Sequence, residues 1–233
     1  MPRRARQAPG GLVYHVLNRA VGRMKLFTKD ADYHAFERVL AQAHQRTPDI
    51  RILSYTLMPN HWHFVLWPKA DGELSRFMFW LTMTHTQRWR HARKLVGLGP
   101  LYQGRFKAFP IERDDHLATV IRYVERNPLR ANLVKRAQDW PHASLAARLA
   151  DNDERQTFLH PWPIDTPADY LQWVNQPQTQ AELTALQTSV RRSRPFGSPA
   201  WQQRTITRLG LESSIRPKGG QRKGSNTVKA KDK

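Results

Sequence analysis

Two short apolar runs joined by a Pro-Asn dipeptide predict a β-hairpin in the first third of the chain. Residues 50–58 and 61–67 are rich in β-branched and aromatic side chains, and Pro-Asn is a turn signal. Side chains alternate between the two faces of a strand, so His61 and His63 share one face and Trp62 points to the other. The hairpin therefore presents two imidazoles side by side, while Trp62 anchors the strand in the core.

The sequence on either side of this hairpin predicts further strands and helices, and together they indicate an α+β fold. Strands and helices alternate in the order β-α-β-β-α-β-α, which predicts an antiparallel β-sheet covered by helices on one face. Asp30 or Asp32 is placed to cap the first helix, and Asp114 or Asp115 the third. The expected strands are residues 11–18, 50–58, 61–67 and 101–111, and the expected helices are residues 30–46, 73–94 and 115–127.

Composition indicates a polyanionic partner. Lys and Arg number 38 against 19 Asp and Glu, a formal net charge of +19. Nucleic acid is the polyanion that such a surface most often meets, and the eight Trp and nine Phe offer rings on which unpaired bases stack. A solvated basic surface or a ribosome-bound protein is the alternative.

Several classes of protein are disfavoured by what the sequence lacks. There are no cysteines, which excludes a disulfide framework and thiolate zinc sites and fits a reducing cytosol. The basic N-terminus has no apolar run behind it, as a secretory signal would have. No apolar stretch approaches the ~20 residues of a membrane span, so a cytoplasmic protein without a membrane partner is expected.

Changes in composition suggest three regions. Residues 1–147 carry the periodic pattern described above and form the expected main domain. Residues 148–215 form an extension whose first part is acidic and rich in Pro, Gln and Trp. Helices are expected in it around residues 167–174 and 180–190. Residues 216–233 form a basic, Gly/Lys/Ser-rich tail that is expected to be disordered when free.

Two small groups of residues are candidates for chemistry. His61 and His63 supply two metal ligands, and a divalent ion needs more. Tyr123 and Asn127 lie four residues apart on one helix face, which places a neutral oxygen ligand one turn beyond a phenol. The alternatives are a packed or surface strand motif for the histidines, and a buried Tyr edge with an Asn cap before Pro128 for the second pair.

Together the two groups suggest one reaction. A divalent ion on His61 and His63 polarises a phosphate while the hydroxyl of Tyr123 attacks it, so the phosphodiester energy is retained in a covalent link. No residue in the sequence clearly accepts the phenol proton. The lone histidines at 15, 85, 91 and 116 are expected to be structural or exposed rather than ligands.

Basic side chains near these groups are candidates for contacts to DNA. Arg105 and Lys107 alternate with Phe residues on the expected fourth strand, and a second basic cluster follows the expected extension helix. A solvated helix face is an equal alternative for the cluster in residues 88–93. The full set is Arg88, Arg90, Arg93, Arg105, Lys107, Arg191, Arg192 and Arg194.

The two central motifs resemble a known family. Residues 55–66 (YTLMPNHWHFVL) and 122–131 (RYVERNPLRA) are similar to the single-tyrosine, His-hydrophobic-His transposases of the IS200-like type. Residues 14–19, 101–107 and 194–201 resemble the branch associated with repetitive extragenic palindromes (REP). The resemblance extends well over residues 10–147 and loosely over the rest.

The resemblance implies a fold similar to the ferredoxin-like or RNA-recognition sheet. It also implies cutting and joining of single-stranded, palindromic hairpin DNA with Mg²⁺ or Mn²⁺ through a 5′-phosphotyrosine intermediate. His61 and His63 match the metal ligands of the family, Tyr123 matches the nucleophile, and Asn127 falls where a third, neutral ligand is expected. A bacterial, nucleoid-associated protein is implied, as a monomer with a dimer as the alternative.

Two other functions are compatible with the residues. An RNA-recognition-type binding module without catalysis also predicts a basic, aromatic sheet but does not need His61 or Tyr123. A zinc-type metallohydrolase would use water as the nucleophile and form no protein–DNA link. The lack of a clear third histidine or acidic ligand makes this second alternative the weaker one.

Overall fold

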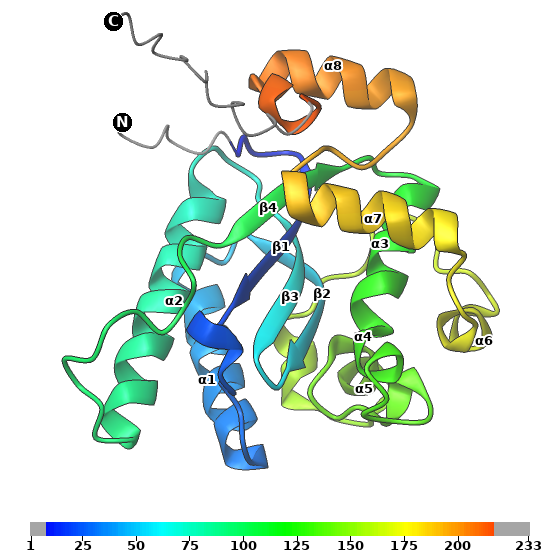
Figure 1. The fold of residues 1–233 in the computed structure, drawn as a ribbon. Helices are drawn as coiled ribbons and strands as arrows, with labels where there is room; N and C mark the ends of the chain where they lie inside the picture. Colours follow the sequence, from blue (N-terminus) through cyan, green and yellow to red (C-terminus); the bar gives the residue numbers. More distant parts are fainter. Residues whose placement is uncertain (1–7, 217–233) are drawn as a thin grey trace, which may run out of the picture.

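The computed structural model describes residues 8–216, and at its centre is a four-stranded antiparallel sheet (Figure 1). The strand order is β2-β3-β1-β4, and each neighbouring pair is antiparallel. The α+β class predicted from the sequence is confirmed. The strands are β1 (Val13–Arg19), β2 (Arg51–Met58), β3 (His61–Trp67) and β4 (Lys107–Ile111).

Helices cover both faces of this sheet, so the expectation of a single covered face was wrong. Helices α1 (Asp30–Arg46) and α2 (Glu73–Ala92) pack on one face with Trp62 and Phe64. Helix α3 (Asp115–Glu125) packs on the other face. The physical reason is that the strands are apolar at alternate positions on both sides, and either face left uncovered would expose that apolar surface.

Most predicted elements form, and the exceptions have local causes. The hairpin of β2 and β3 is confirmed. Strand β4 begins only at Lys107, because the preceding segment bends and pairs only through a bridge between Tyr102 and Ala20. Asp114 caps α3 through the backbone N–H of His116. The first helix has no side-chain cap; Asp32 instead accepts bonds from the backbone and hydroxyl of Thr28.

The C-terminal extension folds against the main domain rather than apart from it. Helices form at Tyr170–Asn175 and Gln180–Arg192, as the sequence predicted, and they pack in the same apolar core as α3. The predicted tail, residues 216–233, lies outside the described residues except for Arg216. The remaining helices are α4 (Asn127–Arg130), α5 (Ser144–Leu149), α6 (Tyr170–Asn175), α7 (Gln180–Arg192) and α8 (Pro199–Leu209), with short 3-10 turns at Val21–Arg23, Ala137–Asp139, Glu154–Phe158 and Glu212–Ser214.

The exposed edge of β4 is covered by part of this extension. The backbone of Phe196 donates to the carbonyl of Pro110 and accepts from the N–H of Glu112, both at 2.9 Å. This pairing satisfies backbone groups that an open sheet edge would leave free. None of the helices between residues 8 and 216 combines the length and apolar character of a membrane span.

Candidate active site

The two histidines of β3 lie together on the face of the sheet that α3 covers. In the register of the sheet, His61 is opposite Arg19 of β1 and His63 is opposite Leu17. The two imidazole centroids are 5.0 Å apart. His63 is 2% exposed, whereas His61 at the start of the strand is partly exposed. The position beside the hairpin turn thus leaves His61 partly open to a ligand, whereas His63 is buried.

Both imidazoles are neutral and each has one ring nitrogen to offer. Burial, with Arg19 and Arg130 nearby, lowers the pKa of His61 to about 3, and burial holds the pKa of His63 well below its usual value. The Nδ1 of His61 donates to Oδ1 of Asn60 at 2.6 Å, which leaves Nε2 free.

The second imidazole is oriented in the same way. Nδ1 of His63 is 2.9 Å from Nε2 of His15, whereas Nε2 of His63 is buried and has no hydrogen-bond partner among the described residues. A bond from His63 Nδ1 to His15 leaves the Nε2 lone pair for an ion. Two neutral imidazoles with free Nε2 atoms fit a divalent transition metal such as Mn²⁺.

Tyr123 of α3 lies edge-on to the rings of His63 and His15. Its ring centroid is 6.0 Å from that of His63 and 6.1 Å from that of His15, in edge-on geometry. The side chain is 5% exposed. Arg130 lies over the phenol ring at 4.5 Å, and its Nη2 donates to the hydroxyl at 3.3 Å. The phenol oxygen is therefore held beside a fixed positive charge.

Asn127 stays on the same face as Tyr123 in spite of the proline that follows it. Helix α3 ends at Glu125 and α4 begins at Asn127, because proline is tolerated in the first turn of a helix. The side-chain amide donates to the carbonyl of Tyr123 at 3.1 Å, and Oδ1 accepts from Arg130 at 2.6 Å. A carbonyl oxygen has two lone pairs, so one remains for a ligand.

A basic cleft of about 530 Å³ lies across β1 from His63. Its wall includes Leu17, which pairs with His63 on one side and with Lys107 on the other, so cleft and histidines are neighbours across β1. No acidic residue is among those that line it in the described chain. Its basic side chains are Arg19, Arg105, Lys107 and Arg191.

The other predicted DNA-contact residues lie elsewhere. Helix α2 is on the opposite face from the histidines; its Arg88 is exposed, while Arg90 donates to backbone carbonyls that follow the helix. Arg93 pairs with Asp32 at 2.8 Å. In the extension, Arg192 and Arg194 also bond within the protein: Arg192 with the carbonyls of Ser214 and Arg216, and Arg194 with Gln202.

Comparison with known proteins identifies the family of the chain that carries this site. A model described as "Transposase IS200 like" matches residues 10–127, which include the hairpin, both histidines and Tyr123. The chain belongs to the IS200-like transposase family. A "REP-associated tyrosine transposase" of Escherichia coli (strain K12) is 24% identical over 166 residues, covering 69% of this chain and 87% of that protein.

A solved structure supports the fold of this IS200-like chain. It is described as the "REP associates tyrosine transposase bound to a REP hairpin" and superposes with a TM-score of 0.50 at 22% sequence identity. The match covers 66% of this chain and 90% of the other. The resemblance to the REP-associated tyrosine transposases that the sequence motifs indicated is therefore confirmed.

Sequence patterns in this IS200-like chain did not identify three residues of the site. Arg130 is three residues after Asn127 and seven after Tyr123, a helical spacing that marks a shared face. His15, expected to be structural, is stacked on His63 at 5.0 Å with planes 4° apart. Arg19 and His15 had no signal, because strand register alone brings them to His61 and His63.

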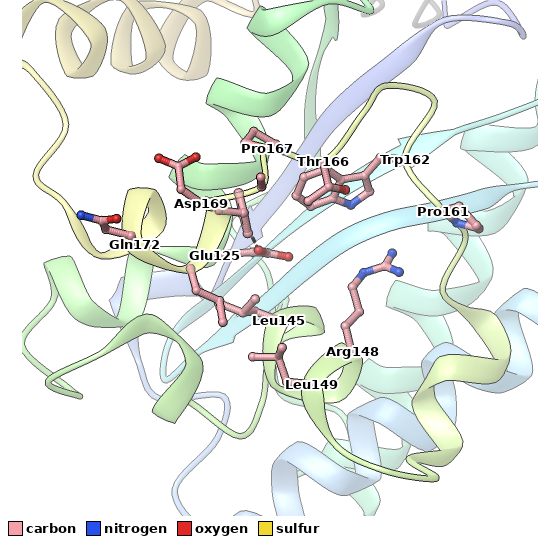
Figure 2. Close-up of a pocket in the computed structure, with 13 residues that line it drawn as sticks. Glu125, Leu145, Arg148, Leu149, Pro161, Trp162, Thr166, Pro167, Asp169 and Gln172 are labelled. Atoms are coloured by element: carbon pink, nitrogen blue, oxygen red, sulfur yellow. Dashed lines mark hydrogen bonds between the residues drawn. The ribbon is translucent and has the colours of Figure 1, made fainter.

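A buried carboxylate ties the tyrosine helix to the rest of the molecule. Glu125 is fully buried, and burial raises its pKa. It accepts bonds from the hydroxyls of Ser54 (3.0 Å), Ser144 (2.8 Å) and Tyr170 (2.6 Å). Figure 2 shows Glu125 at a pocket of about 530 Å³, with Trp162 on one side and Leu145, Leu149 and Arg148 on the other. Strand β2, α5 and α6 thereby fix the position of α3.

Proposed function

We propose that this IS200-like chain is a metal-dependent endonuclease and strand transferase for single-stranded, palindromic hairpin DNA. Tyr123 is the nucleophile, and His61, His63 and Asn127 are the metal ligands. The observation that carries the proposal is the placement of the Tyr123 phenol against His63, at 6.0 Å between ring centroids, beside a basic cleft. The relative bound to a REP hairpin supports DNA of that kind as the substrate.

The reaction that fits this arrangement is a transesterification. The phenol oxygen of Tyr123 attacks the phosphorus, the bond to the 3′ oxygen breaks, and a 5′-phosphotyrosine link and a free 3′-OH result. No water takes part, so attack by a 3′-OH on the link rejoins the strands. A bound Mg²⁺ or Mn²⁺ would polarise the phosphate and offset the charge that develops on its oxygens.

Arg130 has the geometry to assist the attack. Its guanidinium donates to the Tyr123 hydroxyl and so fixes the position of the attacking oxygen beside a positive charge. The same guanidinium bonds Asn127, which keeps both groups in place. Among residues 8–216, no side chain accepts a hydrogen bond from the Tyr123 hydroxyl, and the acceptor of its proton is not assigned.

The basic cleft supports a path for the single strand. Arg19, Arg105, Lys107 and Arg191 offer positive charge to phosphates on the way to the histidines. We assign Arg105, Lys107 and Arg191 to backbone contacts. Arg90, Arg93, Arg192 and Arg194 are held by partners within the protein, which favours a structural role for them.

The proposal is tested by trapping the covalent link. A labelled oligonucleotide with a REP-type hairpin and a single-stranded flank is incubated with the full chain and Mn²⁺, and the products are separated under denaturing conditions. We expect a protein–DNA adduct with the native chain and none with Tyr123→Phe. Tyr33→Phe is the matched control, since Tyr33 is equally buried but lies on the opposite face with α1.

The outcomes separate the proposal from its alternatives. Cleavage without an adduct would indicate hydrolysis by water and would assign the chain to the metallohydrolases. Hairpin binding that is unaffected by His61→Ala, with no cleavage at all, would indicate a binding module. An adduct that survives Tyr123→Phe would refute the assignment of the nucleophile.

A further inference from the structure

A second cluster of metal-ligating side chains lies on the face of the sheet opposite the histidines of β3. Asp30, His34 and Glu37 recur at i, i+4 and i+7 along α1 and therefore share one helix face. His142, from the segment before α5, meets this face. One ligand atom of each of His34, Glu37 and His142 lies within 4.8 Å of those of the other two. A helix and a loop distant in sequence thus converge on one point.

Two members of the cluster are buried in a way that favours a ligand. Glu37 is 6% exposed and His142 is 3% exposed. Burial lowers the pKa of His142, so its imidazole is neutral at neutral pH, which is the form that binds metals. Its Nδ1 is buried without a hydrogen-bond partner among the described residues, and its Nε2 is 3.4 Å from Oδ1 of Asp30.

The two oxygens of Glu37 have different surroundings. Oε1 accepts from the hydroxyl of Tyr55 at 3.2 Å and from Arg155 at 3.0 Å. Oε2 faces Nδ1 of His34 at 3.2 Å, on the side turned away from Tyr55 and Arg155. Arg155 and Tyr55 therefore orient the carboxylate, as partners of metal ligands do, and leave Oε2 directed at His34.

We propose that His34, Glu37 and His142 form a zinc site. Two imidazoles and one carboxylate, with water in the fourth position, make a set that Zn²⁺ accepts in tetrahedral geometry. The carboxylates of Glu37 and of Asp30, which lies 3.4 Å from Nε2 of His142, offset the charge of the ion. The nearby Arg155 pairs with Asp153 at 2.5 Å as well as with Oε1 of Glu37. This site does not depend on the proposed function.

The site would join α1 to the margin of the sheet. The carbonyl of His142 accepts from the N–H of Leu57, and the next residue, Ala143, forms a bridge with Thr56 of β2. An ion held by His142 and by α1 therefore fixes β2 against the helix. The location is separate from His61 and His63, because Tyr55, which bonds Glu37, packs with Phe64 in the core under α1 and α2.

The experiment uses Co²⁺ as a spectroscopic substitute for Zn²⁺ on the full chain after treatment with a chelator. A His61→Ala/His63→Ala/His116→Ala background removes the other histidine pair and the histidine of the group formed with Glu112 and Asp114, so that binding reports the α1 cluster. We expect about one equivalent of Co²⁺ with the visible absorption of a tetrahedral site, displaced by Zn²⁺. Zn²⁺ should also raise the midpoint of thermal unfolding of this variant.

Removal of single ligands tests the composition of the site. The side chain of His34 is largely exposed, so the variant His34→Ala should fold. It should weaken Zn²⁺ binding at least on the order of 100-fold, because even the loss of a residue that only supports a metal ligand lowers affinity by up to about that factor. His142→Gln should abolish the absorption band. His44→Ala, on the same helix but outside the cluster, should leave both unchanged. Absence of stoichiometric Co²⁺ binding in the background variant, or full binding after His34→Ala, would overturn the proposal.

Discussion

At the scale of single residues, Arg130 is the side chain that most directly affects the phenol oxygen of Tyr123. It donates to that oxygen and to Asn127, so its loss removes a fixed positive charge from the attacking group. We expect Arg130→Ala to slow adduct formation by about 100- to 1000-fold, the scale of losing one preorganised donor. The rate of adduct formation under single-turnover conditions measures this.

The control for this prediction is a second arginine at a different position. Arg136 is exposed and pairs with Asp139 on the surface. Arg136→Ala should leave the rate of adduct formation unchanged. Equal rates for the native chain and Arg130→Ala would remove Arg130 from the mechanism, even if hairpin affinity fell.

A buried histidine on the face of the sheet opposite His61 and His63 predicts how the free energy of unfolding depends on pH. His85 accepts a bond from the hydroxyl of Tyr102 at 2.7 Å, and burial lowers its pKa from 6.5 to about 3. Between these values only the unfolded chain binds the proton, so the free energy of unfolding falls as pH falls through this window. From pH 7 to about pH 5, His85 alone should remove about 2 kcal/mol.

Urea unfolding followed by Trp fluorescence at the two pH values measures this effect. The variant His85→Asn keeps an acceptor near Tyr102 but does not titrate, so it should lose about 2 kcal/mol less than the native chain on acidification. His91→Asn, exposed on the same helix, is the control and should behave like the native chain. Identical acid sensitivity of His85→Asn and the native chain would contradict the prediction.

The sequence predicted those site residues whose spacing is local. His61 and His63 are two apart on a strand and Tyr123 and Asn127 four apart on a helical path, and both periods are visible without a fold. His15 is 48 residues from His63, and only the register of β1 with β3 brings them together. Register depends on pairing across the whole sheet, which local patterns do not specify.

At the scale of elements, the covering of β4 by the extension depends on one glycine. A Cβ on Gly197 would lie 2.6 Å from Trp201 and 2.7 Å from Glu112, closer than atoms can pack. We expect Gly197→Ala to loosen Phe196 from Pro110 and to cost about 1–3 kcal/mol of unfolding free energy. Hydrogen exchange at the Glu112 amide, which bonds Phe196, should accelerate.

A matched substitution separates this effect from the general cost of adding a methyl group. A Cβ on Gly99 would have no described atom within 4 Å, and the backbone of Gly99 is not left-handed. Gly99→Ala should change the unfolding free energy by less than about 0.5 kcal/mol. If Gly197→Ala is equally mild and the Glu112 amide stays protected, the extension does not hold the edge of β4.

Elements also mark where sequence patterns were insufficient. The hairpin, α1 and α3 were predicted within a residue or two, because each has a clear apolar period. The single covered face was wrong, since α3 and α2 have similar amphipathic patterns and nothing in the sequence says which face each one takes. Strand β4 was predicted six residues too long, because residues 101–106, with Leu101, Tyr102 and Phe106, resemble a strand but bend.

At the scale of the whole molecule, the net charge of +19 predicts a steep salt dependence of hairpin binding. Arg105 and Arg191 line the cleft beside the histidines and are exposed. The double substitution Arg105→Ala/Arg191→Ala should reduce the slope of log affinity against log salt by about 1 to 1.5, since each phosphate contact on a single strand contributes about 0.7.

Fluorescence anisotropy of a labelled hairpin across a KCl series measures the slope. Arg38→Ala is the control, because Arg38 is exposed on α1, on the opposite face of the sheet. It should leave the slope unchanged. An unchanged slope for the double variant would place the DNA outside this cleft.

The buried Glu125 limits where recombination between related genes can join two coding segments and still give a folded protein. The family match ends at residue 127, yet two of the three hydroxyls that satisfy this carboxylate belong to Ser144 and Tyr170, beyond that boundary. A recombinant that joined residues 10–127 to a foreign C-terminal half would leave a buried carboxyl group without two of its three donors, a cost of several kcal/mol. The heritable unit around Tyr123 therefore extends at least to Tyr170, and successful hybrids should have crossover points after it.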